Sequence, residues 1–361
     1  MHSAVEKEQP AAAHAQAEPT AAFLRACKGL PASHTPIWLM RQAGRYMAEY
    51  RAIRAQYSML ETVHTPELAA EITLQPVRTF GFDAAIIFSD ILPPLASMGL
   101  ELDFVRGEGP VIYNPLTTTR DIDMLATPPA EAGMSGTLGA IKLVAAELAP
   151  KNIPLIGFAG APFTLASYAV EGGSSKQFAK VKALMYSEPA AWKRLMTKLV
   201  TVQADYLLKQ AQAGAAALQV FDSWVGQALG KLDYQRFVAP YNRMLFAMLK
   251  RAGVPVIHFS MGTSSYIEDV AACGGDVMGV DWRMPLDWTW AQIGYDRPIQ
   301  GNLDPVALLA PWRELKHQVD DLLARAGGRP GHIFNVGQGI LPTTPLDNVR
   351  RLVSYIQERT A

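Results

Sequence analysis

Short apolar segments rich in β-branched residues recur along the chain, separated by longer stretches in which apolar positions have helical spacing. Near-continuous apolar runs such as AAIIF and VPVIHF are typical of strands buried on both faces of a parallel sheet. We count eight such runs, at 37–40, 84–88, 153–158, 216–221, 254–259, 276–280, 298–301 and 332–336. Eight strands alternating with helices predict an α/β fold, a single (β/α)8 barrel of the TIM type. An open, doubly wound sheet is the alternative, and the count of eight favours the barrel.

The stretches between these runs predict helices, at 66–80, 131–148, 234–251, 305–326 and 345–358. Two further segments interrupt the alternation of strand and helix. Residues 100–114 alternate on either side of Gly107-Glu108-Gly109, which predicts a β-hairpin inserted after the second strand. Residues 176–214 are long enough for two extra helices, with a break near Ser187-Glu188-Pro189. No linker rich in Gly, Ser or Pro divides the rest, so we expect residues 23–361 to form one barrel domain.

Composition limits the classes of partner. The 361 residues contain 33 Lys and Arg against 33 Asp and Glu, so the formal net charge is zero, and 49% of the residues are hydrophobic. A domain that binds nucleic acid should carry a basic surplus, and a disordered chain should be poor in aliphatic residues, so neither class fits. No run reaches about 18 apolar residues, so we expect no membrane-spanning segment. The expected partners therefore include neither nucleic acid nor a membrane.

The N-terminal segment and the cysteines bear on the compartment. Residues 1–22 are rich in Ala, Glu and Pro, which predicts a disordered tail. The segment has no apolar core of signal-peptide type, and its acidic residues are not typical of an organelle transit peptide. Cys27 and Cys273 are the only cysteines, too few for a disulfide framework or a cysteine-rich zinc site. We therefore expect a cytoplasmic protein.

Polar residues gather directly after the predicted strands, where a barrel builds its active face. In strand order they are Arg41, Gln42, Gly44, Arg45 and Tyr46; Ser89 and Asp90; Gly160, Pro162 and Tyr168; Asp222, Ser223 and Trp224; Asp281 and Trp282; Asn302 and Asp304; and Gly337, Gln338 and Gly339. Polar residues at strand ends also serve as loop residues or helix caps. Asp304 before Pro305 fits that second role, as an N-cap followed by a first-turn proline.

Two arginines and one aspartate carry the most specific chemistry. Arg41 and Arg45 are four residues apart, so a first helical turn would project both guanidinium groups from one face and form an anion clamp suited to carboxylates. A solvated basic face, extended by Arg51 and Arg54, is the alternative. Asp90 follows a very apolar strand, so its carboxylate should be partly desolvated and available for N–H groups or a cation. A helix cap or a partner for one of the arginines is the alternative for Asp90.

Sequence motifs for metals, phosphates and activated nucleophiles are missing. The chain contains no HxxxH or CxxC spacing, no Walker loop, no GxSxG elbow, and no GxGxxG after a strand. His258 fits a buried, hydrogen-bonded histidine better than a metal ligand. The sequence therefore implies no metal site and no phosphate cofactor.

Five segments stand out along the chain, in the order PIWLMRQAGRYMAEYR at 36–51, FDAAIIFSDIL at 82–92, GFAGAPFTLASYAVEGG at 157–173, LQVFDSW at 218–224 and GNLDP at 301–305. Through these segments the chain resembles the uroporphyrinogen decarboxylase family over residues 23–358. The resemblance implies a (β/α)8 barrel and a homodimer whose active-site faces are turned toward each other. It also implies a cofactor-free carboxy-lyase that converts the four acetate groups of uroporphyrinogen III to the methyl groups of coproporphyrinogen III, in haem and chlorophyll synthesis.

The same resemblance implies roles for individual residues. Arg41 and Arg45 would hold substrate carboxylates, and Asp90 would accept the pyrrole N–H groups and stabilise positive charge on the protonated ring. These three are the implied catalytic residues, and the implied substrate-binding residues are Arg41, Gln42, Arg45, Asp90, Tyr168, Phe221, Ser223 and Gln338. A protonated pyrrole can accept the electrons, so no cofactor is implied. The proton donor stays open between Arg41 and a water that an arginine holds.

The last predicted strand departs from the family pattern. Members typically carry Gly-His-Gly there, whereas this chain carries Gly337-Gln338-Gly339. A glutamine can hydrogen-bond a carboxylate but cannot move a proton near neutral pH. Either the usual histidine serves in binding, which Gln338 can take over, or this chain is a slower, divergent member.

Two rival functions are open, and the first of them comes from the same superfamily. A zinc-dependent methyltransferase acting with a corrinoid protein typically uses a His-x-Cys pair near the fifth strand, and this chain has His258-Phe259-Ser260 there. The missing thiolate disfavours that function. A catalytically inactive barrel retained for binding is disfavoured by the set of Arg41, Arg45, Asp90 and Tyr168.

Overall fold

The computed structural model describes residues 19–361 apart from 106 and 108. The disordered tail expected at 1–22 therefore falls almost entirely outside the described residues. Its last residue already belongs to the first helix, α1 (Ala22–Cys27).

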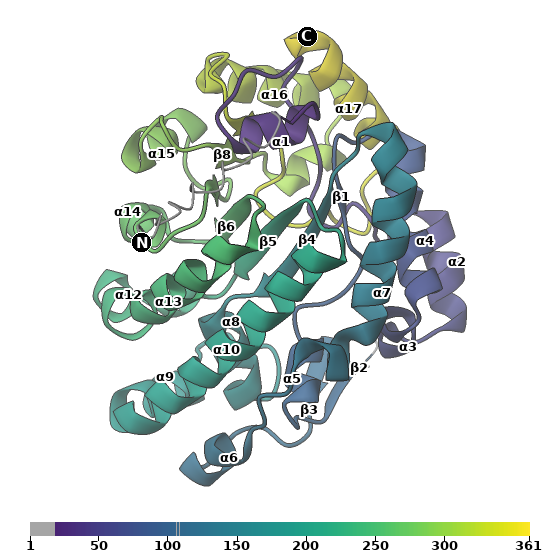
Figure 1. Ribbon diagram of the computed structural model, residues 1–361. Helices are drawn as coiled ribbons and strands as arrows, with labels where there is room; N and C mark the ends of the chain where they lie inside the picture. The colour runs from purple at the N-terminus through teal and green to yellow at the C-terminus, as the bar shows by residue number, and fades with distance from the viewer. Residues whose placement is uncertain (1–18, 106, 108) are drawn as a thin grey trace, which may run out of the picture.

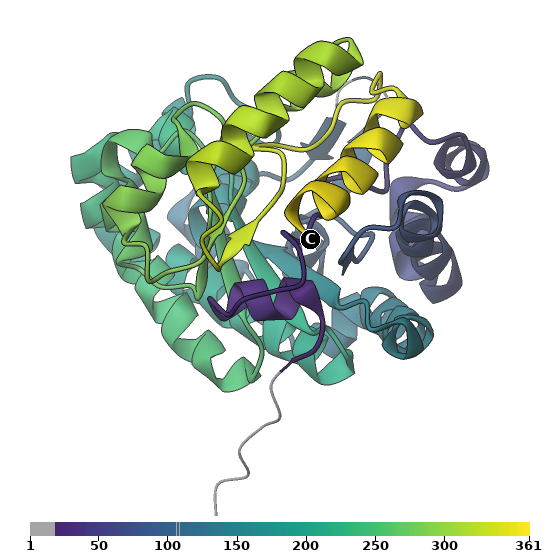
Figure 2. The same cartoon turned by 90° about the horizontal axis from the view of Figure 1, so that it is seen from above.

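A curled, parallel sheet lies at the centre of the molecule, with helices around it (Figures 1 and 2). Its seven strands follow one another in chain order, each hydrogen-bonded to the next. They are β1 (Ala85–Ile86), β4 (Leu155–Gly160), β5 (Ala217–Asp222), β6 (Val256–Ser260), β7 (Val277–Gly279), β8 (Ile299–Gln300) and β9 (His332–Ile333). Each overlaps one predicted run, and nearly all of their residues are buried. The mixed α/β class and seven of the eight predicted strands are confirmed.

The first predicted strand, at 37–40, is not a regular strand of this sheet. It lies between β9 and β1, where Ile37 makes a single parallel bridge to Phe334. The Ile37 N–H donates to the carboxylate of Asp83 at 2.8 Å, and the Met40 N–H donates to Asn335 Oδ1 at 3.0 Å. Side-chain oxygens thus take the backbone donors at both ends of the segment, and only a bridge remains of the expected ladder.

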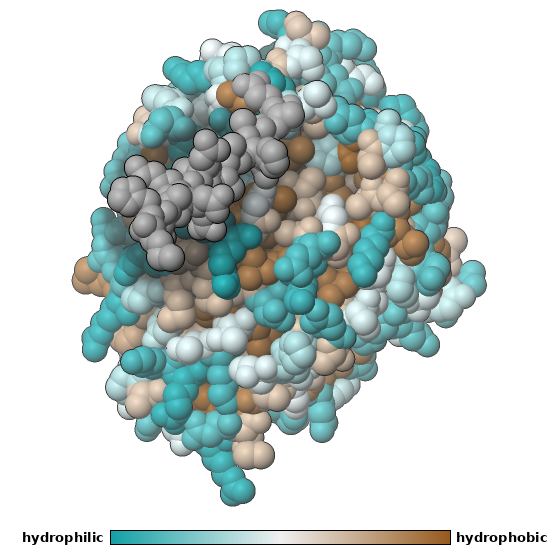
Figure 3. Space-filling model, viewed as in Figure 1, coloured by the Kyte–Doolittle hydropathy of each residue, from teal (hydrophilic) through white to brown (hydrophobic). Residues whose placement is uncertain are grey.

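Helices surround the sheet and turn their polar sides outward. The longer ones are α4 (Pro66–Phe80), α7 (Ala130–Leu148), α8 (Pro162–Glu171), α10 (Pro189–Ala213), α13 (Ala239–Leu249), α16 (Trp312–Ala326) and α17 (Leu346–Thr360). The shorter ones are α2 (Ala48–Gln56), α3 (Met59–His64), α5 (Pro93–Ser97), α6 (Thr119–Met124), α9 (Ala179–Ser187), α11 (Val225–Ala228), α12 (Lys231–Phe237), α14 (Ile267–Ala271) and α15 (Leu286–Ile293), with 3-10 turns at Ala149–Lys151, Lys250–Ala252, Ser264–Tyr266 and Pro305–Leu309. On the face shown in Figure 3, apolar residues reach the surface mainly near the centre and polar ones surround them. No helix among the described residues is long and apolar enough to cross a bilayer.

The helices predicted at 66–80, 131–148 and 345–358 are confirmed, whereas two others are broken. The segment predicted as one helix at 234–251 changes direction at Val238, whose backbone is not helical, and α13 begins there with Pro240 in its first turn. The helix predicted at 305–326 stops before Pro311 and restarts as α16. Proline has no N–H for a helical hydrogen bond, so it starts a new helix more readily than it continues one.

Both predicted insertions are confirmed. The hairpin consists of the antiparallel strands β2 (Leu102–Val105) and β3 (Gly109–Ile112), between β1 and β4 in the chain. Glu108 of its predicted turn lies outside the described residues. The two extra helices are α9 and α10, which break at Glu188. Asp304 is an N-cap as expected, since its Oδ1 accepts the Val306 N–H at 2.9 Å.

Close backbone contacts tie together the loops at the carboxyl ends of the strands. After β5, Gly226 packs so closely on the loop after β6 that an added Cβ would lie 2.3 Å from Met261 O. The Gly262 N–H in turn donates to the carboxylate of Asp281, in the loop after β7. Asn302 Nδ2, after β8, donates to Asp281 O at 2.8 Å. Four successive loops therefore form one connected platform at this edge of the sheet.

We expect Gly226→Ala to lower the free energy of unfolding by about 1–3 kcal/mol, because a methyl group in a packed contact forces the backbone apart. Gly230→Ala is the matched control in the same loop region, since nothing lies within 4 Å of its added Cβ. The control should lose no more than about 1 kcal/mol, which is the cost of an alanine in place of glycine at the N-cap of α12. Urea unfolding of both variants measures the difference, and equal losses would show that the contact between these loops is loose.

Candidate active site

A cavity of about 500 Å³ opens at the carboxyl ends of the strands. Seven of the eight residues expected to bind substrate line it, and they come from the ends of five different strand segments: Arg41, Arg45, Asp90, Tyr168, Phe221, Ser223 and Gln338. The parallel arrangement brings these residues together, since it places all carboxyl ends at one edge of the sheet.

Gln42 is the one predicted binding residue that the structure does not bring to the cavity. Its side chain is fully buried. The amide accepts the Leu39 N–H at 3.1 Å and donates to Ala84 O at 3.1 Å. Gln42 therefore connects the first segment to the start of the β1 region, and its polar atoms are already occupied.

Residues 41–47, which we call the arginine loop, are irregular, so the expectation of a helical turn carrying Arg41 and Arg45 is wrong. Arg41 has a φ of 63°, in the left-handed region, and α2 begins only at Ala48. The Tyr46 hydroxyl donates back to Gln42 O at 2.7 Å and folds the loop on itself. Both arginines still line one cavity, so it is the loop that brings them together, without the helical spacing of four.

The guanidinium groups of Arg41 and Arg45 are available for a ligand. Both residues are solvent-exposed, and neither guanidinium has a hydrogen bond or ion pair to any other described residue. Arg51 and Arg54, in contrast, donate to backbone carbonyls, and neither lines the cavity. Arg51 and Arg54 therefore bind backbone outside the cavity, and the alternative of a solvated basic face over the four arginines stays a prediction.

Asp90 lies in the cavity wall directly after β1. It is half-buried, and its Oδ1 accepts the Leu92 N–H at 3.0 Å. Burial raises the pKa of this carboxyl above its ordinary value, opposed by the Leu92 hydrogen bond and by the charge of Arg41. No salt bridge joins Asp90 to any residue of the described chain. The carboxylate can accept more hydrogen bonds than the Leu92 N–H supplies, so it retains capacity for a cation or an N–H-bearing ligand.

Tyr168, in α8, faces the same part of the cavity. Its ring packs edge-on against Trp224, with centroids 5.7 Å apart. Burial and the negative charge of Asp90 raise the pKa of its hydroxyl to about 12. The hydroxyl therefore keeps its proton at neutral pH and can donate a hydrogen bond to an anion.

Three phenylalanines form an aromatic wall of the cavity. Phe221 contacts Phe158 and Phe259 edge-on, with centroids 5.5 Å and 5.7 Å away. Gln210 fixes Phe158 by bonding to its N–H and its carbonyl, both at 2.8 Å. We predicted only Phe221 from the sequence, although Phe259 holds the paired position on the neighbouring strand. Aligning the strands by their alternation would have found it.

Tyr50 also lines the cavity and was missed. It lies on α2, and its ring packs edge-on against Phe88 at 5.7 Å. No sequence signal separates Tyr50 from an ordinary residue of an amphipathic helix.

His258 points away from the cavity. The alternation of β6 places its ring outside the sheet, 4.5 Å from the ring of Phe246. It is fully buried, but neither ring nitrogen has a hydrogen-bond partner among the described residues, and Nε2 lies 3.9 Å from Asp222 Oδ2. The expectation of a buried histidine holds, and that of a hydrogen-bonded one is wrong. In the described part of the chain, no three His, Cys, Asp or Glu side chains converge as metal ligands would.

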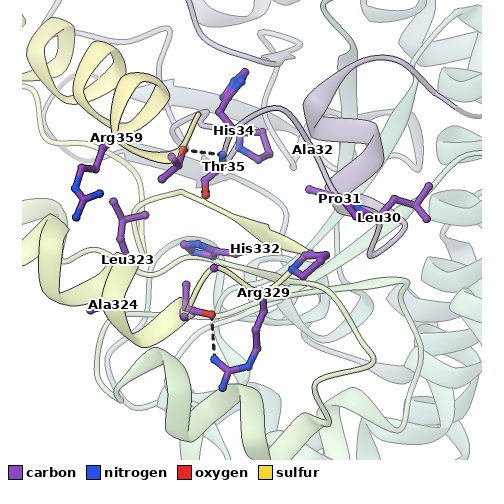
Figure 4. Close-up of a pocket in the computed structure, with 18 of the residues that line it drawn as sticks. Leu30, Pro31, Ala32, His34, Thr35, Leu323, Ala324, Arg329, His332 and Arg359 are labelled. Carbon is purple, nitrogen blue, oxygen red and sulfur yellow. Dashed lines mark hydrogen bonds between the residues drawn. The ribbon is translucent and has the colours of Figure 1, made fainter.

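A second cavity, of about 470 Å³, lies at the opposite, amino-terminal ends of the strands (Figure 4). Its polar groups are largely occupied within the protein. His34 is bonded to Asp83 at 2.7 Å, the Thr35 N–H to Thr360 Oγ1 at 2.8 Å, and Arg329 to Ala326 O at 3.0 Å. The cavity at the carboxyl ends of the strands, where Arg41, Arg45 and Asp90 lie together, is therefore the candidate active site.

Comparison with a solved structure supports the fold. The chain superposes on a methyltransferase from Methanosarcina mazei with a TM-score of 0.80, covering 94% of this chain and 98% of that one. Sequence identity is 20%, so the similarity concerns the fold alone.

Comparisons of sequence identify the family. The family model for uroporphyrinogen decarboxylase (URO-D) matches residues 18–359. A uroporphyrinogen decarboxylase from Solibacter usitatus is 53% identical over 94% of this chain and 97% of its own length. Another, from Thermus thermophilus, is 51% identical over 94% and 98%. With a family match over nearly its whole length, and with two unpaired guanidinium groups and a partly desolvated carboxyl in one cavity, the chain belongs to the uroporphyrinogen decarboxylase family.

Proposed function

We propose that this chain, a carboxy-lyase by its family, removes the four acetate carboxyl groups of uroporphyrinogen III and leaves the methyl groups of coproporphyrinogen III, in haem biosynthesis. One observation supports this above the others: Arg41 and Arg45 have no partner in the described structure and lie in one cavity with the Asp90 carboxyl. The proposed substrate presents the complementary pattern, with carboxylates at its periphery and N–H groups at its centre. Its apolar rings match the aromatic wall.

Decarboxylation breaks the bond between the acetate methylene and its carboxylate, and the electron pair must move into the rest of the substrate. We propose that a pyrrole ring, protonated on carbon, accepts this pair as carbon dioxide leaves. A proton then adds to the methylene carbon to form the methyl group, and the ring returns its extra proton. The substrate itself is the electron acceptor, so this scheme uses no bound cofactor.

Asp90 is proposed to stabilise the positive charge on that ring. Its ionised form accepts the pyrrole N–H groups and faces the cation that develops when the ring is protonated. Burial raises its pKa because water does not fully solvate the carboxylate, and the same poor solvation strengthens its attraction to a cation. The carboxylate is therefore poorly solvated in the free enzyme, and the positive charge of the transition state compensates for that missing solvation.

Arg41 and Arg45 are proposed to hold substrate carboxylates, with Tyr168 and Ser223 contacting the acetate or propionate arms. Guanidinium groups stay charged at working pH and present a planar set of donors that fits a carboxylate. Arg41 crosses over Gly339, where an added Cβ would lie 2.4 Å from Arg41 Cδ. Gly339 therefore leaves room for the arginine stem.

We further propose that residues 37–40 complete the sheet as an eighth strand, so that residues 23–361 form a single closed (β/α)8 barrel. The Ile37 bridge to Phe334 on one side and the 3.0 Å bond from the Asp83 N–H to Ile37 O on the other support this. We also propose a homodimer acting in the cytoplasm, without nucleic acid or membrane as a partner. Both cysteines are free and buried, which supports a reducing compartment.

Asp90→Asn should lower kcat for uroporphyrinogen by about 100-fold or more, because an amide cannot balance the ring cation. Anaerobic incubation with uroporphyrinogen, followed by measurement of carboxyl loss, is the assay and also the direct test of the proposed function. A variant that keeps most of its turnover would contradict the role of Asp90. A wild-type protein that removes no carboxyl group would contradict the proposed function itself.

The same variant should be more stable than the wild type at pH 7.5. A folded-state pKa above the unfolded one means that the folded state binds more protons between the two values, so wild-type stability falls as the pH rises through the folded pKa of Asp90. Asparagine removes this loss. Urea unfolding across pH should show the advantage of Asp90→Asn shrinking as the pH falls through that pKa, and an advantage that is independent of pH would point to another cause.

Arg41→Met and Arg45→Met should each raise KM by about tenfold or more, since each removes a charge-assisted hydrogen bond worth about 1.5–3 kcal/mol. Arg325→Met is the control, because Arg325 pairs with Asp321 and Asp287 outside the cavity. Steady-state kinetics with uroporphyrinogen should show no change for this control. An unchanged KM in both cavity variants would contradict the carboxylate role.

Gln338 lines the cavity and is exposed there, which supports the binding role for this position. Gln338→His should therefore change kcat/KM by less than about threefold, whereas Gln338→Ala should raise KM because the amide donor is lost. A tenfold or larger gain in turnover for Gln338→His would instead show that the chain is a slower, divergent member.

A further inference from the structure

Arg51 holds the arginine loop from the adjacent helix. Its Nη1 donates to Arg45 O at 2.8 Å and to Tyr46 O at 3.0 Å. One nitrogen with two hydrogens thus binds two consecutive carbonyls, and one of them belongs to the residue whose own guanidinium lines the cavity.

The two carbonyls constrain the backbone on which the Arg45 side chain is carried. Fixing the oxygens of Arg45 and Tyr46 orients the two peptide planes that follow the Arg45 Cα, and this limits the rotation of the residue. The first half of the loop has other anchors, the buried Gln42 amide and the Tyr46 hydroxyl on Gln42 O. Arg51 supplies side-chain anchors for the second half.

The position of Arg51 is unfavourable for the helix that carries it. Arg51 is the fourth residue of α2, and its guanidinium reaches back toward the N-terminal end, where the helix dipole disfavours a cation. No residue of α2 is fully buried, and its N-cap, Met47, provides no side-chain hydrogen bond. The contacts of Arg51 therefore serve the loop more than they stabilise the helix.

We propose that Arg51 is a positioning residue that orients Arg45 toward the substrate carboxylate through the backbone of residues 45 and 46. This inference rests on the proposed function, in which Arg45 binds that carboxylate. Arg51 does not line the cavity, so it acts through Arg45 and not by touching the substrate.

A double-mutant cycle tests the inference, with steady-state kinetics on uroporphyrinogen for the wild type, Arg51→Met, Arg45→Met and the double variant. We expect Arg51→Met to raise KM about five- to tenfold with kcat within about twofold, because binding geometry is lost and the reacting groups stay in place. In the Arg45→Met background, the Arg51 substitution should add almost nothing, since the residue it orients is already gone.

Arg54→Met is the matched control. Arg54 lies on the same helix and also binds backbone, donating to Tyr57 O, but it holds the far end of α2 and not the arginine loop. The Arg54→Met substitution removes one positive charge from α2, as Arg51→Met does. KM should therefore stay within about twofold, and urea unfolding should show similar stability for both single variants.

The outcomes separate two failures. If Arg45→Met leaves KM unchanged, the proposed carboxylate role of Arg45 is wrong, and the inference about Arg51 falls with it. If Arg45→Met raises KM but Arg51→Met does not, the carboxylate role stands and the positioning role is wrong. The positioning role would also be wrong if the two single-variant increases in KM multiplied in the double variant. It would likewise be wrong if Arg54→Met raised KM as much as Arg51→Met, since that would show a general effect of charge.

Discussion

The site depends on one constraint, the common direction of every strand in the central sheet. Parallel strands in chain order place all of their carboxyl ends at the same edge, so residues from Arg41 to Gln338 meet in one cavity. The glycine contacts and the bonds to Asp281 then hold the loops after β5 to β8 as one unit. This platform carries Ser223 and Trp224 of the cavity wall, whereas Arg41 and Arg45 are held by their own loop.

The charged side chains in this cavity have no salt-bridge partners within the described part of the protein. Some arginines elsewhere in the described chain are paired with carboxylates, as Arg78 and Arg325 are on the surface. Arg41 and Arg45 have no such partner in the described chain, and Asp90 has no salt bridge there. Burial disfavours the ionised form of Asp90 and raises its pKa. A ligand that brings both carboxylates and N–H groups satisfies all three at once. The neutral net charge of the chain is compatible with this, because a polyanion in a cleft requires only a local excess of positive charge.

The backbone geometry of the arginine loop also helps to place Arg41 and Arg45 at the cavity. Arg41 adopts a left-handed conformation that is uncommon for a residue with a side chain, and it is held there by the loop that Gln42, Tyr46 and Arg51 anchor. A regular helix at this point would have satisfied local preference better. The irregular loop instead carries both arginines to the cavity, and Gly339 leaves space for one of them.

The sequence by itself determined the class of the fold, seven of the strands, both insertions, and seven of the residues that line the cavity. It could do so because burial on both faces of a parallel strand leaves a continuous apolar run, and because the polar residues that follow such runs must lie at the active edge. It failed where side chains replace backbone pairing: Asp83 accepts the Ile37 N–H and Asn335 accepts the Met40 N–H, so a predicted strand became a bridge. It also failed where proline broke two long amphipathic segments.

Tertiary structure alone decided the details of the site. Helical spacing assigned Arg41 and Arg45 to one face, but hydrogen bonds from Tyr46 and Arg51 hold them in a loop. The Gln42 side chain turns inward and donates to Ala84 O. The sequence suggested that Arg51 belongs to a solvated basic face, and in the structure it binds two carbonyls of the arginine loop. Sequence patterns report burial and periodicity, which are local properties. The partner of a polar group is set by what the fold brings beside it, and no local pattern contains that information.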